Sequence, residues 1–240
     1  MIEGADMKII KNIFRILLLC VLIFVGIKVN EGYQMYKVAL EETSLESKVQ
    51  EIKNKKNYTT ISELPQIYID AVVAVEDHRF FEHNGIDIVS IGRAIFNDIK
   101  AMKFVEGGST ITQQLAKNSY FTQEKKITRK IAEIFMAFEF EKNYSKNEIL
   151  EFYLNTSYFG EGCYSVKEAS NIYFDKLPIE MNDYEAIMLA GIPNAPSVYA
   201  PTVNPDLAKE RQLQVIQKMI RYDVLTEDKA KIILEGENYE

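Results

Sequence analysis

The sequence predicts a mainly α-helical protein that carries one membrane-spanning helix near its N-terminus. An apolar run lies near the start of the 240 residues, and apolar residues recur at helical spacing through most of the remainder, whereas the alternating pattern of strands is scarce. Hydrophobic residues make up 47% of the chain and charged residues 26%, a composition that excludes wholesale disorder. The segment 65–240 is long enough to bury one core.

Composition also excludes several functional classes. The two cysteines, Cys20 and Cys163, are too few for a disulfide scaffold or a cysteine-rich zinc site. The two histidines, His78 and His83, lack the His-Glu-x-x-His spacing that places two zinc ligands one helical turn apart. The net charge of −7 argues against nucleic acid as a partner.

The first element is the apolar run. Residues 16–27 contain no charged side chain, and a helix from about Ile9 to Val29 is long enough to cross a hydrocarbon core of about 30 Å. Basic residues before the run favour a cytoplasmic N-terminus, with the rest of the chain outside the cytoplasm. A cleaved signal peptide and a buried core helix are the alternatives, but no Ala-x-Ala-like cleavage site follows the run. We expect residues 1–30 to form a cytoplasmic tip and a transmembrane anchor.

We expect residues 31–64 to be a polar stalk or linker and residues 65–240 to form the functional domain. Within that domain the patterns predict one helix after another. These are a mostly buried helix after Pro65, a helix over 128–142, a helix opened by a capping box at 145–148, and helices that start near residues 182 and 204. The apolar stripe of the 128–142 helix consists of Ile131, Ile134, Phe135 and Phe138. The apolar segment 86–104 is either a helix on the membrane surface or an ordinary amphipathic helix.

Four polar clusters are candidates for chemistry, and the first is Glu76–Gly85. Glu76 follows an apolar helical stretch, and burial at such a position can raise the pKa of a carboxyl group toward the range of a general base. A solvated carboxylate that merely ends a helix is the alternative. His83 precedes Asn84 and Gly85, so we expect it in a turn or at a helix C-cap.

The second cluster, Gly107–Asn118, combines two glycines with the start of a helix. Ser109 or Thr110 can cap that helix, whose free N–H groups suit an anion or a sugar oxygen. Gln113 and Gln114 add amide donors and acceptors. The alternative is a hinge followed by a polar helix.

The third cluster is basic. Residues 117–130 carry five basic side chains and one acidic one, although the chain as a whole is acidic. This reversal suits a phosphate or pyrophosphate ligand, and a solvated helix face is the alternative. Glu133 follows Arg129 by four positions, so we expect an ion pair along one helix. In the fourth cluster, Lys146–Gly160, we expect Glu151 to fix a neighbouring element.

These clusters, in this order, resemble the motifs of the peptidoglycan glycosyltransferase family. That family comprises monofunctional biosynthetic transglycosylases and the N-terminal domains of class A penicillin-binding proteins. The resemblance covers about residues 65–220. The matching residues are Glu76, Asp77, Phe80, His83 and Gly85 in the first motif, Gly107 through Gln114 in the second, Arg129, Lys130 and Glu133 in the third, and Lys146, Ile149, Leu150, Tyr153, Leu154 and Asn155 in the fourth.

The chain departs from the family pattern at two places. Lys125 stands where many members have an arginine, which keeps a positive charge but not the bidentate fork. After the fourth motif, Ser165 and Ser170 occur in a stretch where the family often has Gly-x-Tyr-Gly and paired alanines. No Ser-x-x-Lys occurs in the 240 residues, so we expect no transpeptidase domain within them.

The resemblance implies a lysozyme-like helical domain with a smaller membrane-proximal lobe, acting on lipid II at the outer membrane face. Glu76 would be the general base, and Glu133 a second carboxylate near the pyrophosphate or a divalent cation, Mg²⁺ or Mn²⁺. The implied partners are lipid II, the growing glycan chain, the membrane and a separate transpeptidase. The residues implied to bind substrate are Asp77, Phe80, His83, Gly108, Ser109, Thr110, Gln113, Gln114, Lys117, Asn118, Lys125, Arg129 and Lys130.

Two other functions stay open at this point. A lysozyme-like lytic glycosidase also uses a carboxylate on a helical fold, but it needs no cationic site for a lipid pyrophosphate. A non-catalytic, membrane-tethered cell-wall scaffold would not need Glu76 and Glu133, and both are present.

Overall fold

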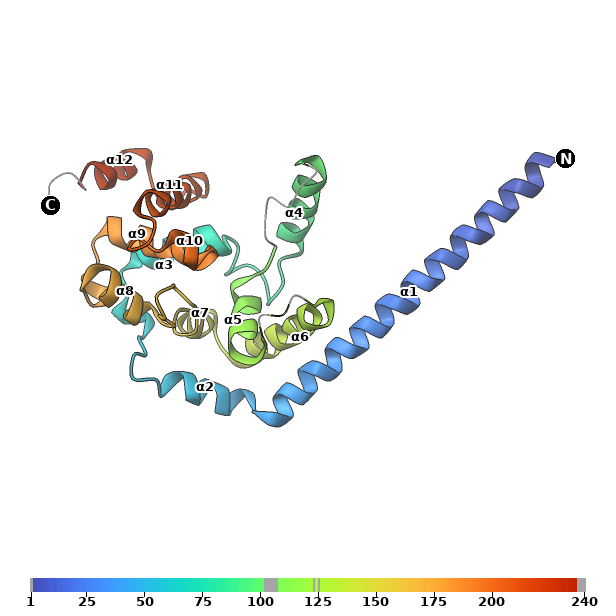
Figure 1. Ribbon diagram of the computed structural model, residues 1–240, viewed down its shortest axis with the longest axis horizontal. Coiled ribbons are helices and arrows are strands. Elements are labelled where there is room, and N and C mark those ends of the chain that lie inside the picture. Colours follow the sequence, from blue (N-terminus) through green and yellow to red (C-terminus); the bar gives the residue numbers. More distant parts are fainter. Residues whose placement is uncertain (1, 102–107, 123, 125, 237–240) are drawn as a thin grey trace.

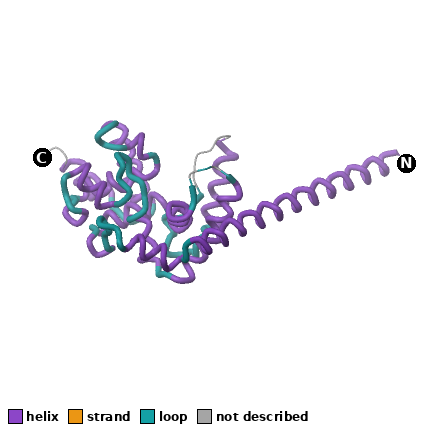
Figure 2. Tube along the Cα trace, turned by 60° about the horizontal axis from the view of Figure 1, so that its bottom comes forward, coloured by secondary structure: helices purple, strands orange, loops and turns teal. Residues whose placement is uncertain are grey.

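The computed structural model describes residues 2–101, 108–122, 124 and 126–236, and these residues are mostly helical (Figure 1). Within this described part the strand-like pairing is limited to an isolated bridge between Gly160 and Cys163, and Figure 2 shows helices joined by loops. The prediction of a mainly α-helical fold is confirmed.

The helices follow one another along the described part of the chain. They are α1 (Ile2–Glu42), α2 (Leu45–Lys53), α3 (Gln66–Glu76), α4 (Ile88–Ala101), α5 (Ile111–Tyr120), α6 (Ile127–Asn143), α7 (Lys146–Leu154), α8 (Val166–Phe174), α9 (Asp183–Gly191), α10 (Pro196–Tyr199), α11 (Pro205–Arg221) and α12 (Glu227–Gly236), with 3₁₀ turns at Ile61–Glu63, Pro178–Glu180 and Ile192–Asn194.

Helix α1 is continuous and extends beyond the predicted anchor. Its segment Lys11–Glu42 contains an 18-residue window with a mean hydropathy of 2.3, and none of that window is buried. The large apolar side chains from Ile13 to Val29 are exposed. Contact with lipid is favourable for such apolar side chains, whereas contact with water is not. The helix also satisfies its own backbone hydrogen bonds, as a membrane span must. The helix therefore fits a single membrane span.

The C-terminal part of α1 packs closely against α6. A Cβ atom added at Gly32 would lie 2.6 Å from the Cβ atom of Ile131, so the two backbones approach where α1 has no side chain. The rings of Tyr33 and Phe135 meet edge to face with their centroids 5.2 Å apart. Part of the apolar stripe predicted on α6 thus faces α1, whereas the fully buried apolar side chains of α6 are Ala132, Met136, Ala137 and Phe140.

The segment 31–64 is packed rather than free, which differs from the expected stalk. Beyond α1, helix α2 places Leu45, Val49 and Ile52 in the core of the domain, because their spacing puts them on one helical face. The carboxylate of Glu151 accepts a hydrogen bond from the Ile61 N–H at 2.6 Å, which confirms that this side chain fixes a neighbouring element. The boundaries of the domains stay predictions.

Helix α3 lies in the middle of the domain core and packs against α9 and α11, while α5 packs against α6 and α7. Tyr68, Ala71 and Val72 of α3 are at most 2% exposed. Burying a large apolar side chain contributes about 1.5–3 kcal/mol, so this central position holds the helix firmly. The predicted helix starts near 145, 182 and 204 are confirmed, the first two with complete capping boxes.

Helix α4 projects from the rest of the domain on the same side as the N-terminal half of α1 (Figure 1). Its apolar side chains Ile88, Val89 and Phe96 are 80%, 56% and 67% exposed. The segment 86–104 is therefore helical over most of its described part and turns apolar residues outward, and its last three residues lie outside the described range.

Replacing Gly32 by alanine is expected to weaken the contact between α1 and α6. The added methyl group would overlap Ile131, and such overpacking lowers the free energy of unfolding by about 1–3 kcal/mol. The thermal midpoint of the full chain in detergent micelles, followed by circular dichroism, measures the effect. Gly26→Ala is the matched control, because no atom lies within 4 Å of its added Cβ. Equal midpoints for the two variants would contradict the packing.

Candidate active site

Glu76 is the last residue of α3 and lines a cleft of about 600 Å³. The helix ends here because Asp77 adopts non-helical dihedral angles (φ −158°, ψ 75°). The Oε2 atom of Glu76 accepts a hydrogen bond from Nε2 of Gln114 at 2.8 Å. A helix whose earlier residues are buried thus presents its last carboxylate to the cleft, next to the first turn of α5.

The start of α5 forms one wall of this cleft. The Thr110 hydroxyl oxygen accepts a hydrogen bond from the Gln113 N–H at 3.1 Å, and the Gln113 side-chain oxygen accepts one from the Thr110 N–H at 3.0 Å. Gln113 is buried in this capping box and does not line the cleft, which differs from its expected contact with substrate. Gly108, Ser109 and Gln114 do line the cleft, as does Thr110.

Asp77 connects the end of α3 to the start of α5. Its Oδ2 atom accepts a hydrogen bond from the Ile111 N–H at 3.0 Å and lies 2.9 Å from Nε2 of His83. His83 lies in the turn region that follows α3, as the sequence suggested, and its buried side chain is also the partner of Asp77. Phe80 has no exposed surface and packs in the core. Neither His83 nor Phe80 lines the cleft, and their expected roles in binding substrate stay predictions.

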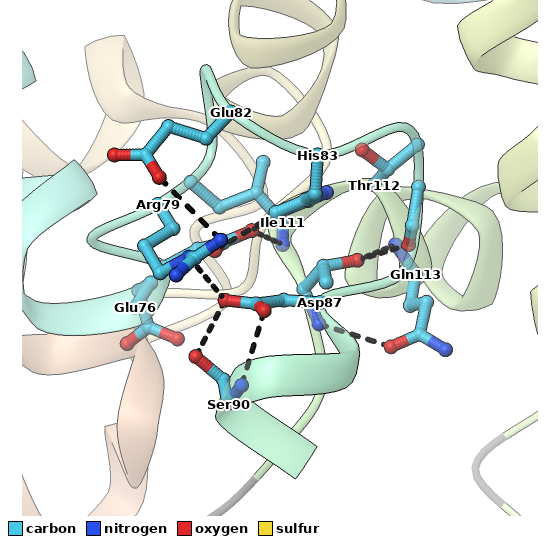
Figure 3. A network of polar contacts seen from close by, with 12 residues as sticks. Glu76, Arg79, Glu82, His83, Asp87, Ser90, Ile111, Thr112 and Gln113 are labelled. Atoms are coloured by element: carbon cyan, nitrogen blue, oxygen red, sulfur yellow. Dashed lines mark hydrogen bonds and ion pairs between the residues drawn. The ribbon is translucent and has the colours of Figure 1, made fainter. Parts of the chain in front are cut away.

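A further polar group at the cleft was missed by sequence reasoning. Figure 3 shows Asp87 between Arg79 and Ser90. The Asp87 carboxylate accepts hydrogen bonds from the N–H groups of Val89 and Ser90, each at 3.0 Å, and lies 3.3 Å from Nε of Arg79. Burial alone would raise the pKa of Asp87, but the Ser90 hydrogen bonds and the Arg79 charge hold it below its usual range. An aspartate directly before a helical apolar run was the available signal.

The third cluster surrounds a buried carboxylate. Glu133 is 1% exposed, and Arg129 contacts one of its oxygens while Nζ of Lys130 lies 2.9 Å from the other. The predicted ion pair between Arg129 and Glu133 is confirmed. Lys130 also donates a hydrogen bond to Oγ of Ser109 at 2.6 Å. The cations of α6 are therefore held against the residues that lead into α5.

Lys117 links this cationic group to Glu76. Burial lowers the pKa of Lys117, the Arg129 charge lowers it further, and the Glu76 carboxylate opposes the shift. Burial, and then the charges of Arg129 and Lys117, lower the pKa of Lys130 to about 8. Such mutual shifts require charges that lie close together. Arg129 itself lines a separate cavity of about 240 Å³ beside α1.

A cavity of about 440 Å³, distinct from the one beside α1, adjoins the Glu76 cleft. Gln114, Lys117 and Pro193 line both spaces, whereas Asn118 lines the second one alone. The sequence-predicted residues from α5 are thus divided between two connected spaces. Lys125, which was expected to bind phosphate, lies outside the described residues.

The donor chemistry for a metal ion is sparse. Within the described part of the chain there is no group of three or more His, Cys, Asp or Glu side chains that could hold one. Both oxygens of Glu133 already contact cations. The described residues therefore do not fit a metal site built from protein ligands alone. Mg²⁺ commonly binds through substrate phosphates and one or two carboxylates instead of such a site.

Comparison with known proteins places the chain among relatives. A family model described as Transglycosylase matches residues 41–220. Penicillin-binding protein 1F of Bacillus subtilis (strain 168) is 48% identical over 160 residues, which cover 67% of this chain and 22% of that protein. Penicillin-binding protein 1A of Neisseria flavescens is 40% identical over 200 residues, which cover 82% of this chain and 25% of that protein.

A crystal structure of penicillin-binding protein 1A from Haemophilus influenzae aligns with 74% of this chain and 17% of that chain, at 21% identity and a TM-score of 0.44. The chain spans about a quarter of the length of the curated relatives it matches. The family match includes α2, all four motif clusters and the residues that line the Glu76 cleft and the adjoining 440 Å³ cavity, apart from Arg221 and Tyr222 at the cleft. The chain therefore belongs to the transglycosylase family and contains a glycosyltransferase domain.

Proposed function

We propose that this domain is a peptidoglycan glycosyltransferase that polymerises lipid II into glycan strands for cell-wall synthesis. The observation that carries the proposal is that Glu76 and Lys117 line one cleft, and that the charge of Lys117 is coupled both to Glu76 and to Arg129. A carboxylate beside a cationic group suits a reaction in which a hydroxyl group loses a proton while a diphosphate departs.

In the proposed reaction, Glu76 takes the proton of the 4-hydroxyl group of the acceptor sugar. The oxygen attacks C1 of the lipid-linked donor from the face opposite the leaving group. The new glycosidic bond inverts C1, and the bond from C1 to the pyrophosphate oxygen breaks with its electron pair, which releases undecaprenyl pyrophosphate. The hydrogen bond from Gln114 positions the Glu76 carboxylate for this step.

The cationic group would receive the negative charge of the leaving group. Lys117, Arg129 and Lys130 would neutralise the pyrophosphate, and Glu133 would act as a positioning residue that holds the last two. A Mg²⁺ or Mn²⁺ ion bound mainly by the pyrophosphate oxygens is proposed as a further counter-charge, and no step above depends on it.

The membrane is the proposed place of the reaction because both substrates carry lipids and α1 fits a single span. The basic residues before the span support a cytoplasmic N-terminus and a domain outside the cytoplasm. The growing glycan chain and a separate transpeptidase are the further proposed partners. The lytic alternative has less support, because cutting a glycan strand requires no cationic pocket for a diphosphate.

Glu76→Gln is expected to abolish polymerisation of lipid II. Loss of the base lowers the turnover rate by about 10²–10⁴-fold, while the amide keeps the size of the side chain and its place beside Gln114. Glycan strands resolved on a gel after incubation of the full chain with lipid II measure the effect.

Asp70→Asn is the matched control, since it makes the same chemical change on α3 at a residue that does not line the cleft. The control is expected to polymerise at the wild-type rate, and both variants to melt at the wild-type temperature. Glycan synthesis by Glu76→Gln within tenfold of the wild-type rate would contradict the proposed base. Shortening of preformed strands by the wild-type chain, without synthesis, would favour the lytic function.

Binding of inorganic pyrophosphate is expected to weaken as the pH rises from 7 to 9. The pKa of Lys130 is lowered to about 8, so its charge is present below that pH and is lost above it. The dissociation constant should rise by up to about tenfold per pH unit above 8.

The lowered pKa of Lys130 also affects stability. Between pH 8 and pH 10.5 the unfolded chain, whose lysine has the ordinary pKa of 10.5, still binds the proton that folded Lys130 has lost. Lys130 therefore raises the free energy of unfolding as the pH rises from about 8 to 10.5.

Isothermal titration of the full chain with pyrophosphate at several pH values measures this dependence. Lys130→Arg keeps its charge throughout the range and is expected to flatten the profile. The same pH profile in wild type and in Lys130→Arg would show that another group causes the dependence.

A further inference from the structure

The side chain of Gln114 has two chemically different ends. Its Nε2 atom donates the hydrogen bond to Glu76 at 2.8 Å, and its Oε1 atom accepts one from the hydroxyl group of Tyr153 at 3.5 Å. A rotation of the amide by half a turn would exchange these ends and bring an oxygen against the carboxylate of Glu76. An ionised carboxylate only accepts hydrogen bonds, so that contact would be repulsive. The bond to Glu76 therefore depends on the group that fixes the orientation of this amide.

Tyr153 is a buried donor at the oxygen end of the amide. The residue is 1% exposed, so its hydroxyl group needs an acceptor within the protein. Burial, and then the charge of Glu76, raise the pKa of Tyr153 well above its ordinary value, and the Ser157 hydroxyl opposes the shift only in part. The phenol therefore keeps its proton over the whole range in which the protein works, and this proton is available to Gln114.

Tyr153 is itself held from behind, by the segment that precedes α3. The Asn155 side chain accepts a hydrogen bond from the Thr59 N–H at 2.9 Å and donates one to the Thr59 carbonyl oxygen at 2.8 Å. Both residues are buried, with 0% and 3% exposure. Two bonds to one backbone residue define direction as well as distance, and α7 also packs against α5. The C-terminal end of α7 thus keeps the Tyr153 hydroxyl group directed at Gln114.

We propose that Tyr153 is a positioning residue that holds the Gln114 amide in the orientation that donates to Glu76. Tyr153 acts through Gln114 and makes no contact with the reacting groups. The proposal rests on the proposed function for the reaction that Glu76 performs, whereas the orientation of the amide is a property of the chain alone.

Tyr153→Phe tests the proposal, because it removes the hydroxyl group and keeps the ring in the core. The Gln114 amide can then turn, and Glu76 loses its donated hydrogen bond in a part of the molecules. A carboxylate without such a bond holds its proton more tightly, so the acid limb of the profile of turnover rate against pH is expected to move up by about 0.5–1 pH unit. The turnover rate with lipid II at pH 7 should fall roughly three- to tenfold, with a KM within about twofold of wild type.

Tyr68→Phe is the matched control. Tyr68 is 0% exposed, and within the described residues its hydroxyl oxygen has no hydrogen-bond partner. The control thus loses the same atom from the same core without releasing Gln114. It is expected to keep the rate and the acid limb of wild type, and the thermal midpoints of both variants show whether the fold is kept. Identical acid limbs in Tyr153→Phe and Tyr68→Phe would overturn the proposal.

A double variant shows whether Tyr153 acts through Gln114. Gln114→Ala removes the amide, so adding Tyr153→Phe is expected to change the turnover rate of Gln114→Ala by less than about twofold. If the effects of the two substitutions instead multiply, Tyr153 acts by another route, and the proposal is wrong.

A readout without lipid II separates this proposal from the proposed function. The full chain in detergent micelles, labelled with ¹³C at the glutamate carboxyl groups, is titrated by NMR, and the Glu76 signal is identified by its absence in Glu76→Gln. This signal is expected to titrate at higher pH in Tyr153→Phe than in Tyr68→Phe. The same difference in a chain that makes no glycan would contradict the proposed function and leave the positioning role standing. Normal polymerisation by wild type, with Glu76 signals that titrate alike in the two variants, would contradict the positioning role alone.

Discussion

The hydrogen bond from the Ile111 N–H to the carboxylate of Asp77 joins the two elements that make the cleft. Asp77 follows the last residue of α3, and Ile111 is the first residue of α5. His83 holds the same carboxylate from another element, and all three groups are buried. Leaving such a group without its partner costs about 1–3 kcal/mol, so the junction is strongly defined. It brings Gln114, in the first turn of α5, against Glu76. The placement of Glu76 therefore depends on a contact that lies behind the cleft.

The cationic side of the site has a different energetic character. Lys117, Arg129 and Lys130 lie close enough to lower the pKa values of both lysines, while Glu133 contacts Arg129 and Lys130, and the Glu76 charge acts on Lys117 in the opposite direction. Holding like charges together is unfavourable until an anion enters. The fold thus maintains an excess of positive charge beside Glu76, and a diphosphate would relieve it. This is the kind of preorganisation that makes electrostatic stabilisation effective, because the protein does not need to rearrange when the charge develops.

The apolar helix α1 is packed against the domain rather than joined to it by a flexible linker. Helix α1 continues to Glu42, and its last turns contact α6, which carries Arg129 and Glu133. The absence of a side chain at Gly32 permits this close approach. The membrane span and the cationic residues are therefore parts of one packed unit, with the exposed apolar side chains of α4 on the same side of the domain (Figure 1). Such an arrangement suits substrates that arrive by diffusion in the membrane plane.

The sequence by itself determined the helical class, the apolar span, several helix starts and the ion pair between Arg129 and Glu133. Each of these follows from local rules, since periodicity, capping boxes and the i, i+4 pair of Arg129 and Glu133 involve neighbouring residues. Only the tertiary structure decided which polar residues face the cleft. Gln113 and Gln114 are adjacent and chemically identical, yet one caps its helix and the other meets Glu76. The same holds for the segment 31–64, which reads as polar but buries Leu45, Val49 and Ile52. The spacing of residues shows which side chains share one face of a helix. The element that covers that face comes from a distant part of the sequence, so spacing cannot identify it. Only the packing of the two elements shows whether a polar side chain is buried or faces the cleft.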